Sequence, residues 1–234
     1  MDGDIPDLRG LLGTCRALNA CLLVDVCHDL GTSGPNGTGT LGRDGILGEV
    51  DIVVGSLSKA FCANGGFMLV NDMAAVYTLK CFSGPYAYST SFSPIQVSIA
   101  LEAIRIAKSD EGECLRQRLR AVSTALRSGL CGRGFKVYGE EGSPIVPLHL
   151  GREGLARIAG GRAFELGLVA TVIEFPVVTL GAARYRFSLK PNYKDEQIDA
   201  AIELTAKAVH DAHRLYDELN NRMLELGGLA DEAV

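Results

Sequence analysis

One lysine follows the end of a strand-like apolar stretch. Residues 50–54 are apolar β-formers apart from Asp51, and Gly55, a short serine-containing turn and Lys59 come next. The chain then stays small or apolar as far as Val70, so the turn offers little to cover the cation. A lysine amine held in a dry pocket is a nucleophile able to form a Schiff base. On this stretch alone, a surface lysine after a strand is the simpler alternative.

A carboxylate interrupts a second strand-like pattern upstream. Residues 20–28 are mostly apolar, Asp25 breaks the run and His28 stands at its exit. An ionised carboxylate in an apolar strand requires a cation or a strong donor beside it. The protonated ring nitrogen of pyridoxal phosphate is such a partner, and that protonation makes the ring an electron sink. Asp25, His28 and Lys59 together therefore predict a pyridoxal phosphate site, and the nearby hydroxyls suit a phosphate.

Composition excludes several other classes of function. The formal net charge is −5 and no run of lysine or arginine occurs, which argues against nucleic acid as the main partner. No apolar run approaches the ~20 residues of a membrane span, and the N-terminus lacks the features of a secretion signal. The seven cysteines include no C-x-x-C pair, which predicts buried thiols in a reducing, cytoplasmic compartment. Cys27-His28 has no second ligand pair at zinc spacing, so we expect no metal site.

The hydrophobic periodicity predicts an α/β protein. Strands are expected at 20–28, 50–54, 66–70, 135–138, 145–150, 168–175 and 183–189, and helices at 5–19, 72–82, 94–107, 110–130, 154–166 and 194–226. The glycine-rich residues 29–45 and the hydroxyl-rich residues 83–94 are expected to be loops. Residues 37–42 match a dinucleotide-binding pattern only by chance, because they neither follow a strand nor open an apolar-periodic helix.

Six stretches in order resemble the α-oxoamine synthase family of fold-type I pyridoxal-phosphate enzymes. These are residues 1–4, 24–28, 56–59, 88–91, 109–112 and 181–189. The family includes 8-amino-7-oxononanoate synthase, 2-amino-3-ketobutyrate ligase, 5-aminolevulinate synthase and serine palmitoyltransferase. The resemblance extends to about residue 210. It implies that residues 1–108 are part of the cofactor-binding large domain, with a mostly parallel sheet, and that residues 109–234 form a small C-terminal α+β domain with a long terminal helix.

The resemblance assigns roles to four residues near the predicted cofactor. Lys59 would hold pyridoxal 5′-phosphate as a Schiff base and later move the Cα proton. Asp25 would pair with the pyridine nitrogen, and His28 would contact the phenolic oxygen. Ser56 would donate a hydrogen bond to the phosphate. The alternatives are a satisfied core histidine at position 28 and an ordinary turn serine at position 56.

The resemblance also assigns roles at a distance from the lysine. Ser89 and Thr90 would reach the phosphate of the neighbouring subunit's cofactor, which implies a homodimer. Arg186 resembles the arginine that holds the amino-acid carboxylate, because a planar guanidinium pairs with a carboxylate at two points. The alternative for Arg186 is a solvent-facing strand arginine. For Arg184, on the same strand face, that solvent-facing interpretation is the one we favour.

The chain departs from the family in composition and in extent. Cys27 replaces a usual alanine against the ring, Cys62 replaces a usual glycine, and Glu174 stands where some members carry a second arginine near the substrate. Residues 1–4 lie well inside the family's chains, after the glycine-rich turn and the side chain that stacks on the ring. We therefore expect an N-terminally truncated enzyme with an exposed apolar sheet edge and poor solubility.

The implied reaction is decarboxylative condensation of an amino acid with an acyl-CoA or acyl carrier protein to give a 2-amino ketone. A fold-type I aminotransferase is one alternative, because it needs the same lysine and aspartate. A non-catalytic partner subunit or gene remnant is the other, and this fragment could be inactive. The residues around 181–189 and 89–91 favour the synthase.

Overall fold

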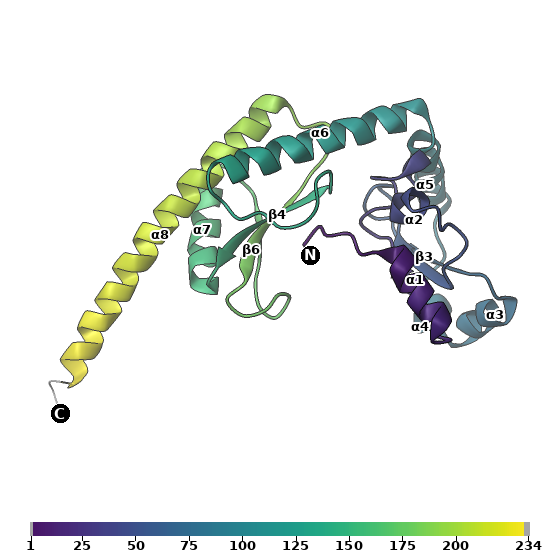
Figure 1. Ribbon diagram of the computed structural model, residues 1–234, viewed down its shortest axis with the longest axis horizontal. Coiled ribbons are helices and arrows are strands. Elements are labelled where there is room, and N and C mark those ends of the chain that lie inside the picture. The colour runs from purple at the N-terminus through teal and green to yellow at the C-terminus, as the bar shows by residue number, and fades with distance from the viewer. Residues whose placement is uncertain (1, 232–234) are drawn as a thin grey trace. The chain divides into compact units, whose positions relative to one another are not determined.

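The computed structural model describes residues 2–231, and these pack as two compact units. One unit is Ile5–Gln117, and the other joins Met1–Asp4 to Arg118–Val234. The division falls inside helix α6 (Asp110–Gly132), which is drawn in teal in Figure 1. Units of packing and domains of a family need not coincide, so the domain boundary expected near residue 109 stays a prediction.

The unit Ile5–Gln117 is built on a small mixed sheet. Strands β1 (Leu23–Asp25) and β2 (Ile52–Ser56) are parallel, and β3 (Gly66–Val70) runs antiparallel beside β2, in the order β1-β2-β3. Gly55 faces Phe67 across the sheet, and a Cβ on Gly55 would lie 2.3 Å from that ring. Glycine at position 55 therefore lets the aromatic ring pack over β2 just before the turn that carries Lys59.

Several helices belong to the same unit, and α3 (Met73–Phe82) contacts β3. They are α1 (Leu8–Ala17), the 3₁₀ turn η1 (Pro35–Gly37), α2 (Gly39–Arg43), α3, α4 (Gly84–Ala87) and α5 (Pro94–Ala107). Asp72 caps α3 by accepting from two backbone N–H groups, and Ser93 caps α5. The expected loops at 29–45 and 83–94 thus each contain a short helix. A small core of Leu8, Leu12, Val26, Leu41, Ile46 and Val50 lies under α1 and α2.

The second unit has an antiparallel sheet with a larger core. Strands β4 (Ile145–Gly151), β6 (Ala183–Ser188) and β5 (Thr171–Ile173) lie in the order β4-β6-β5, and β6 pairs with both neighbours. Helix α7 (Glu153–Glu165) packs against α8 (Asp195–Asp231), the yellow helix of Figure 1. Small residues allow the two helices to approach closely: Ala156, Ala159, Ala163, Ala208 and Ala212.

Three expected strands differ markedly from the structure, and the strand expected at 20–28 is reduced to the three residues of β1. Residues 135–138 lie beside β4 but form only an isolated bridge between Val137 and Leu148, so the predicted strand is wrong. Gly134 and Gly139 have positive φ angles of 82° and 79°, which end the extended backbone on both sides. The strand expected at 168–175 shrinks to the three residues of β5. Within residues 2–231, no helix is both long and apolar enough to cross a membrane.

Candidate functional site

Asp25 and Lys59 lie at the same edge of the β1-β2-β3 sheet. Asp25 is the last residue of β1 and pairs in register with Val54 of β2. Because β1 and β2 are parallel, their carboxyl ends meet at one edge, and Lys59 follows β2 by three residues. Ligands of α/β sheets bind outside the carboxyl ends of strands. The positive charge of Lys59 is close enough to lower the pKa of Asp25. The structure therefore brings together the two residues on which the sequence prediction depends.

The Asp25 carboxylate is held in its ionised form. Its pKa lies below the ordinary value, first because the Cys27 thiol donates a hydrogen bond to it. Partial burial opposes this, while the Cys27 N–H, at 2.9 Å from Oδ1, and the charges of Lys59 and His28 lower the pKa further. An ionised carboxylate at this edge can accept a hydrogen bond from a protonated ring nitrogen.

The sequence predicted that the side chains of this site are buried, and that prediction is wrong. Asp25, His28 and Lys59 are all exposed, as are Cys21 and Cys62, whereas Cys27 is half-buried. The physical reason is the position of β1, which forms an edge of its three-stranded sheet. Apolar neighbours in sequence therefore do not place Asp25 in a dry environment, because no further strand of this unit covers it.

The turn that carries Lys59 is tight and rich in hydroxyls. Ser56 Oγ and Ser58 Oγ are 2.6 Å apart, and the Ser58 N–H also donates to Ser56 Oγ at 3.1 Å. The Cys62 N–H returns to the Lys59 carbonyl at 3.2 Å, and Cys62 has φ of 51°. That left-handed conformation favours glycine, which explains why glycine is the expected residue there. Sequence reasoning singled out Ser56 and missed its partner Ser58, although their two-residue spacing in a turn was the available signal.

The remaining predicted site residues lie elsewhere. Ser89 and Thr90 are exposed in the segment between α4 and α5. Arg186 is half-buried on β6, opposite Pro147 and Thr171, and it belongs to the other unit. The roles of these three residues stay predictions.

Arg184 corrects another expectation. It is buried and not solvent-facing, and it forms an ion pair with Asp2. Its Nε donates to the Ala182 carbonyl at 3.1 Å, and its guanidinium carbon lies 4.8 Å from the centre of the Tyr138 ring. Burial lowers the pKa of Arg184. A nearby carboxylate and an aromatic face thus make burial of this cation possible, and they anchor residues 2–4 to the second unit.

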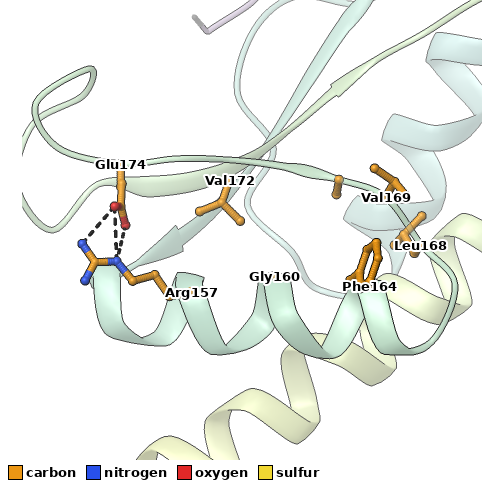
Figure 2. Close-up of a pocket in the computed structure, with 8 residues that line it drawn as sticks. Arg157, Gly160, Phe164, Leu168, Val169, Val172 and Glu174 are labelled. Carbon is orange, nitrogen blue, oxygen red and sulfur yellow. Dashed lines mark hydrogen bonds and ion pairs between the residues drawn. The ribbon is translucent and has the colours of Figure 1, made fainter.

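A groove beside β5 was not predicted. It has a volume of about 370 Å³ and is lined by Arg157, Gly160, Phe164, Leu168, Val169, Ala170, Val172 and Glu174. Figure 2 shows Arg157 reaching from α7 to Glu174 at one end, with Nε to Oε2 and Nη2 to Oε1 distances of 2.9 Å. Hydrogen bonds from Arg157 lower the pKa of Glu174. The Glu174 carboxylate is therefore paired with the exposed Arg157 and is unsuited to proton transfer at neutral pH.

Comparison with known proteins gives one family match over most of the chain. A family model described as aminotransferase class I and II matches residues 1–204. The 8-amino-7-oxononanoate synthase of Geobacter metallireducens is 33% identical over 206 residues, which are 88% of this chain and 52% of that protein. The chain spans about half the length of the curated relatives that it matches.

Solved structures give a consistent picture of the fold. A serine palmitoyltransferase from S. paucimobilis, solved with a bound PLP–myriocin aldimine, has a TM-score of 0.84 and 28% identity to this chain. The match covers 91% of this chain and 53% of that chain. An 8-amino-7-oxononanoate synthase from Francisella tularensis has a TM-score of 0.75 and 26% identity, with 91% and 61% covered. The predicted fold class is confirmed: the chain has the α/β fold of fold-type I pyridoxal-phosphate transferases, with a partial sheet.

Proposed function

The chain belongs to the aminotransferase class I and II family, and from that premise we propose that it binds pyridoxal 5′-phosphate at the edge formed by Asp25, His28, Ser56 and Lys59. We further propose that the reaction served by this site is the decarboxylative condensation of an amino acid with an acyl-CoA. Relatives named 8-amino-7-oxononanoate synthase and a structural neighbour named serine palmitoyltransferase support this acyltransferase class.

One observation carries the proposal: an ionised carboxylate and a lysine lie at the same carboxyl edge of two parallel strands. Asp25 is exposed, so a ring nitrogen can approach its carboxylate, and the Lys59 charge already acts on that carboxylate. The hydroxyls of Ser56 and Ser58 lie in the same turn as the lysine, where they suit a phosphate. The residues present therefore fit the cofactor.

The bound cofactor would supply an electron sink for a carbanion at the substrate Cα. Lys59 Nζ would attach the cofactor covalently and afterwards carry the Cα proton. Asp25 would keep the ring nitrogen protonated by accepting its hydrogen bond, and His28 would orient the ring through the phenolic oxygen. Ser56 would donate to the phosphate, and Arg186 would hold the substrate carboxylate at two points.

The assembly and location of the enzyme are part of the same proposal. An acyl carrier protein could replace CoA as the acyl donor. Ser89 and Thr90 would complete the phosphate site of a second copy, so the active form would be a homodimer with the active site at the subunit interface. A reducing, cytoplasmic location, expected because the sequence has no C-x-x-C pair, belongs to the same proposal.

An aminotransferase is the alternative favoured by the description of the family model. It would use Asp25 and Lys59 in the same way but would exchange the amino group with a keto acid. The two reactions differ in their products, because only the condensation releases free thiol and carbon dioxide. A non-catalytic partner subunit or gene remnant would give neither product.

The test supplies the cofactor, a panel of carboxyl-labelled amino acids and acyl-CoA thioesters to the full chain. We expect free CoA thiol and labelled carbon dioxide in equal amounts, lost in Lys59→Ala. Lys80→Ala is the matched control, since Lys80 is an exposed lysine on α3 of the same unit. Keto-acid exchange without thiol release would favour the aminotransferase, and neither product would favour the partner subunit.

A further inference from the structure

The groove between α7 and β5 has two chemically different ends. Its helix wall carries Arg157, Gly160 and Phe164, which are spaced i, i+3 and i+7 and therefore share one face of α7. Figure 2 shows the Arg157–Glu174 ion pair at one end of the groove and Phe164, near Val169, at the other. Seven helical residues rise about 10 Å, which is the separation of the two ends along α7. A ligand that fills the groove therefore needs charge at one end and apolar surface at the other.

The apolar part of the groove is open to solvent. Phe164 and Val169 are 72% and 82% exposed. In the middle of the groove, a Cβ on Gly160 would lie 2.7 Å from Val172 Cγ2, so glycine keeps this part of the floor low. The volume of about 370 Å³ is that of a small-molecule site. A large apolar side chain placed against Phe164 would remove apolar surface of both partners from water.

The charged end offers both a donor and an acceptor to a ligand. Arg157 Nε donates to Glu174 Oε1 and Oε2 at 3.2 and 2.9 Å, and Nη2 donates to Oε1 at 2.9 Å. In the part of the chain that the structure describes, no hydrogen bond uses Arg157 Nη1, and Glu174 Oε2 accepts only one. The Arg157 side chain is 68% exposed and that of Glu174 is 29% exposed. A zwitterion can therefore lie beside the pair, its anion on Arg157 and its cation on Glu174, without breaking it.

A neighbouring acid argues against a ligand with a negative charge alone. Glu153 lies one turn before Arg157 on α7, and its charge contributes to raising the pKa of Arg157. Its Oε1 accepts a hydrogen bond from the Gly181 N–H at 2.8 Å. Two carboxylates, those of Glu153 and Glu174, thus act on one guanidinium, and a simple fatty acid would add a third. A ligand that carries an ammonium beside its carboxylate avoids that repulsion.

We propose that this groove binds a free α-amino acid with a large apolar side chain. Its carboxylate would contact Arg157, its ammonium Glu174 and its side chain Phe164. The choice of ligand follows from charge complementarity, because an α-amino acid holds an ammonium and a carboxylate on one carbon and the ion pair presents the opposite charges side by side. The site is distinct from the candidate cofactor site, since Asp25 and Lys59 belong to the other unit.

The first test compares ligands on the unmodified full chain, without cofactor. Saturation-transfer NMR would measure binding of L-phenylalanine and L-leucine, and of three analogues that each lack one feature. Glycine lacks the side chain, N-acetyl-L-phenylalanine lacks the ammonium and 2-phenylethylamine lacks the carboxylate. We expect both amino acids to bind and each analogue to bind about tenfold more weakly or less. No binding of L-phenylalanine, or equal binding of the analogues, would overturn the proposal.

The second test locates the ligand. Arg157→Ala, Glu174→Gln and Phe164→Ala should each weaken binding of L-phenylalanine about tenfold. Arg152→Ala and Leu180→Ala are the matched controls, because both residues are exposed in the same unit and neither lines the groove. Normal binding in all three groove variants, or the same loss in the controls, would show that the ligand lies elsewhere.

Arg186→Ala separates the groove from the candidate substrate site. Binding of L-phenylalanine should be unchanged, because Arg186 lies on β6 opposite Pro147 and Thr171 and does not line the groove. Loss of binding in Arg186→Ala, with normal binding in Arg157→Ala, would place the ligand at the candidate substrate arginine and overturn the proposal. Since no cofactor is present, that result would leave the proposed function standing. A chain that failed to bind pyridoxal phosphate would still show the groove site.

Discussion

The two units differ in how much of their apolar surface their own residues cover. In the unit that includes Arg118–Val234, the apolar residues of α6, β4 and β6 are buried in one continuous core, for example Leu126, Leu148 and Tyr185. In Ile5–Gln117 the core is small, and large apolar side chains on α3, α4 and α5 are exposed. The second pattern is that of helices that need a further surface to pack against.

Helix α5 shows this most clearly. Its exposed apolar residues are Ile95, Val97, Ile99, Leu101 and Ile104, and they lie on more than one face of the helix. A helix that is apolar on all sides is normally buried. The candidate cofactor site lies in this more open unit, where Asp25, His28 and Lys59 are exposed. The candidate site therefore lies in the unit that leaves more of its apolar helix surface exposed.

The largest effect is a difference in lost stability between alanine substitutions of two helical leucines, one in each unit. Leu126 is 1% exposed in the core of the second unit, and Leu101 is 52% exposed on α5. Leu126→Ala should cost about 2–5 kcal/mol of local stability through the cavity it leaves, and Leu101→Ala less than about 0.5 kcal/mol. Hydrogen exchange of the β4 and β6 amides would measure the first and that of α5 the second. Similar losses for both would show that α5 is packed in solution.

The next largest effect is expected from loss of the Asp2–Arg184 ion pair, which holds residues 2–4 against the second unit. Asp2→Asn removes the anion beside the buried Arg184 and leaves the cation with the Ala182 carbonyl and the Tyr138 ring. We expect a loss of about 1–3 kcal/mol, seen as faster hydrogen exchange in β6. Asp4→Asn, which changes another acid of the same segment, is the control. An unchanged exchange rate in Asp2→Asn would contradict a stabilising ion pair.

Charge on α5 should alter association rather than stability. Leu101→Lys adds a cation to the exposed apolar surface, so the chain should bind less of an apolar fluorescent dye and self-associate less. Val169→Lys is the matched control, because Val169 is also exposed but lies in the other unit. Sedimentation at several concentrations would show the difference. Lower association in both variants alike would mean that the exposed α5 face is not special.

The smallest effect is expected at the Arg157–Glu174 pair. Hydrogen bonds from Arg157 lower the pKa of Glu174, so the pair stabilises the fold above the unfolded-state pKa of the acid. This stabilisation is lost as pH falls through the lower folded-state pKa. Arg157→Ala should raise the pKa of Glu174, measured by carboxyl NMR, whereas Arg152→Ala should not. An unchanged Glu174 titration in Arg157→Ala would contradict the pair.

The sequence predicted the bounds of a helix or strand well where capping or turn residues mark its ends. Helix 94–107 and strand 66–70 were predicted with the bounds that the structure shows, since Ser93 and Pro94 define the start of the helix. The strand at 135–138 failed because its partner forms only one bridge, which depends on backbone angles at Gly134 and Gly139. Strand pairing is a tertiary property that a local pattern does not contain.

The strand patterns predicted that Asp25 and Lys59 lie at one edge of the sheet, but not how exposed the two side chains are. Asp25 and Lys59 lie at the same edge because two parallel strands end there, and the sequence patterns predicted both strands. Their exposure could not be read from apolar neighbours, because it depends on β1 being an edge strand. The burial of Arg184 was also hidden, since its anion comes from Asp2, far away in sequence.

The central claim is that Lys59 carries the cofactor, and one measurement tests it most directly. The full chain would be mixed with pyridoxal phosphate, reduced with borohydride, digested and analysed by mass spectrometry. We predict a phosphopyridoxyl group on the peptide that contains Lys59, present in Lys80→Ala and missing in Lys59→Ala. Label spread over several surface lysines, or retained in Lys59→Ala, would contradict the account.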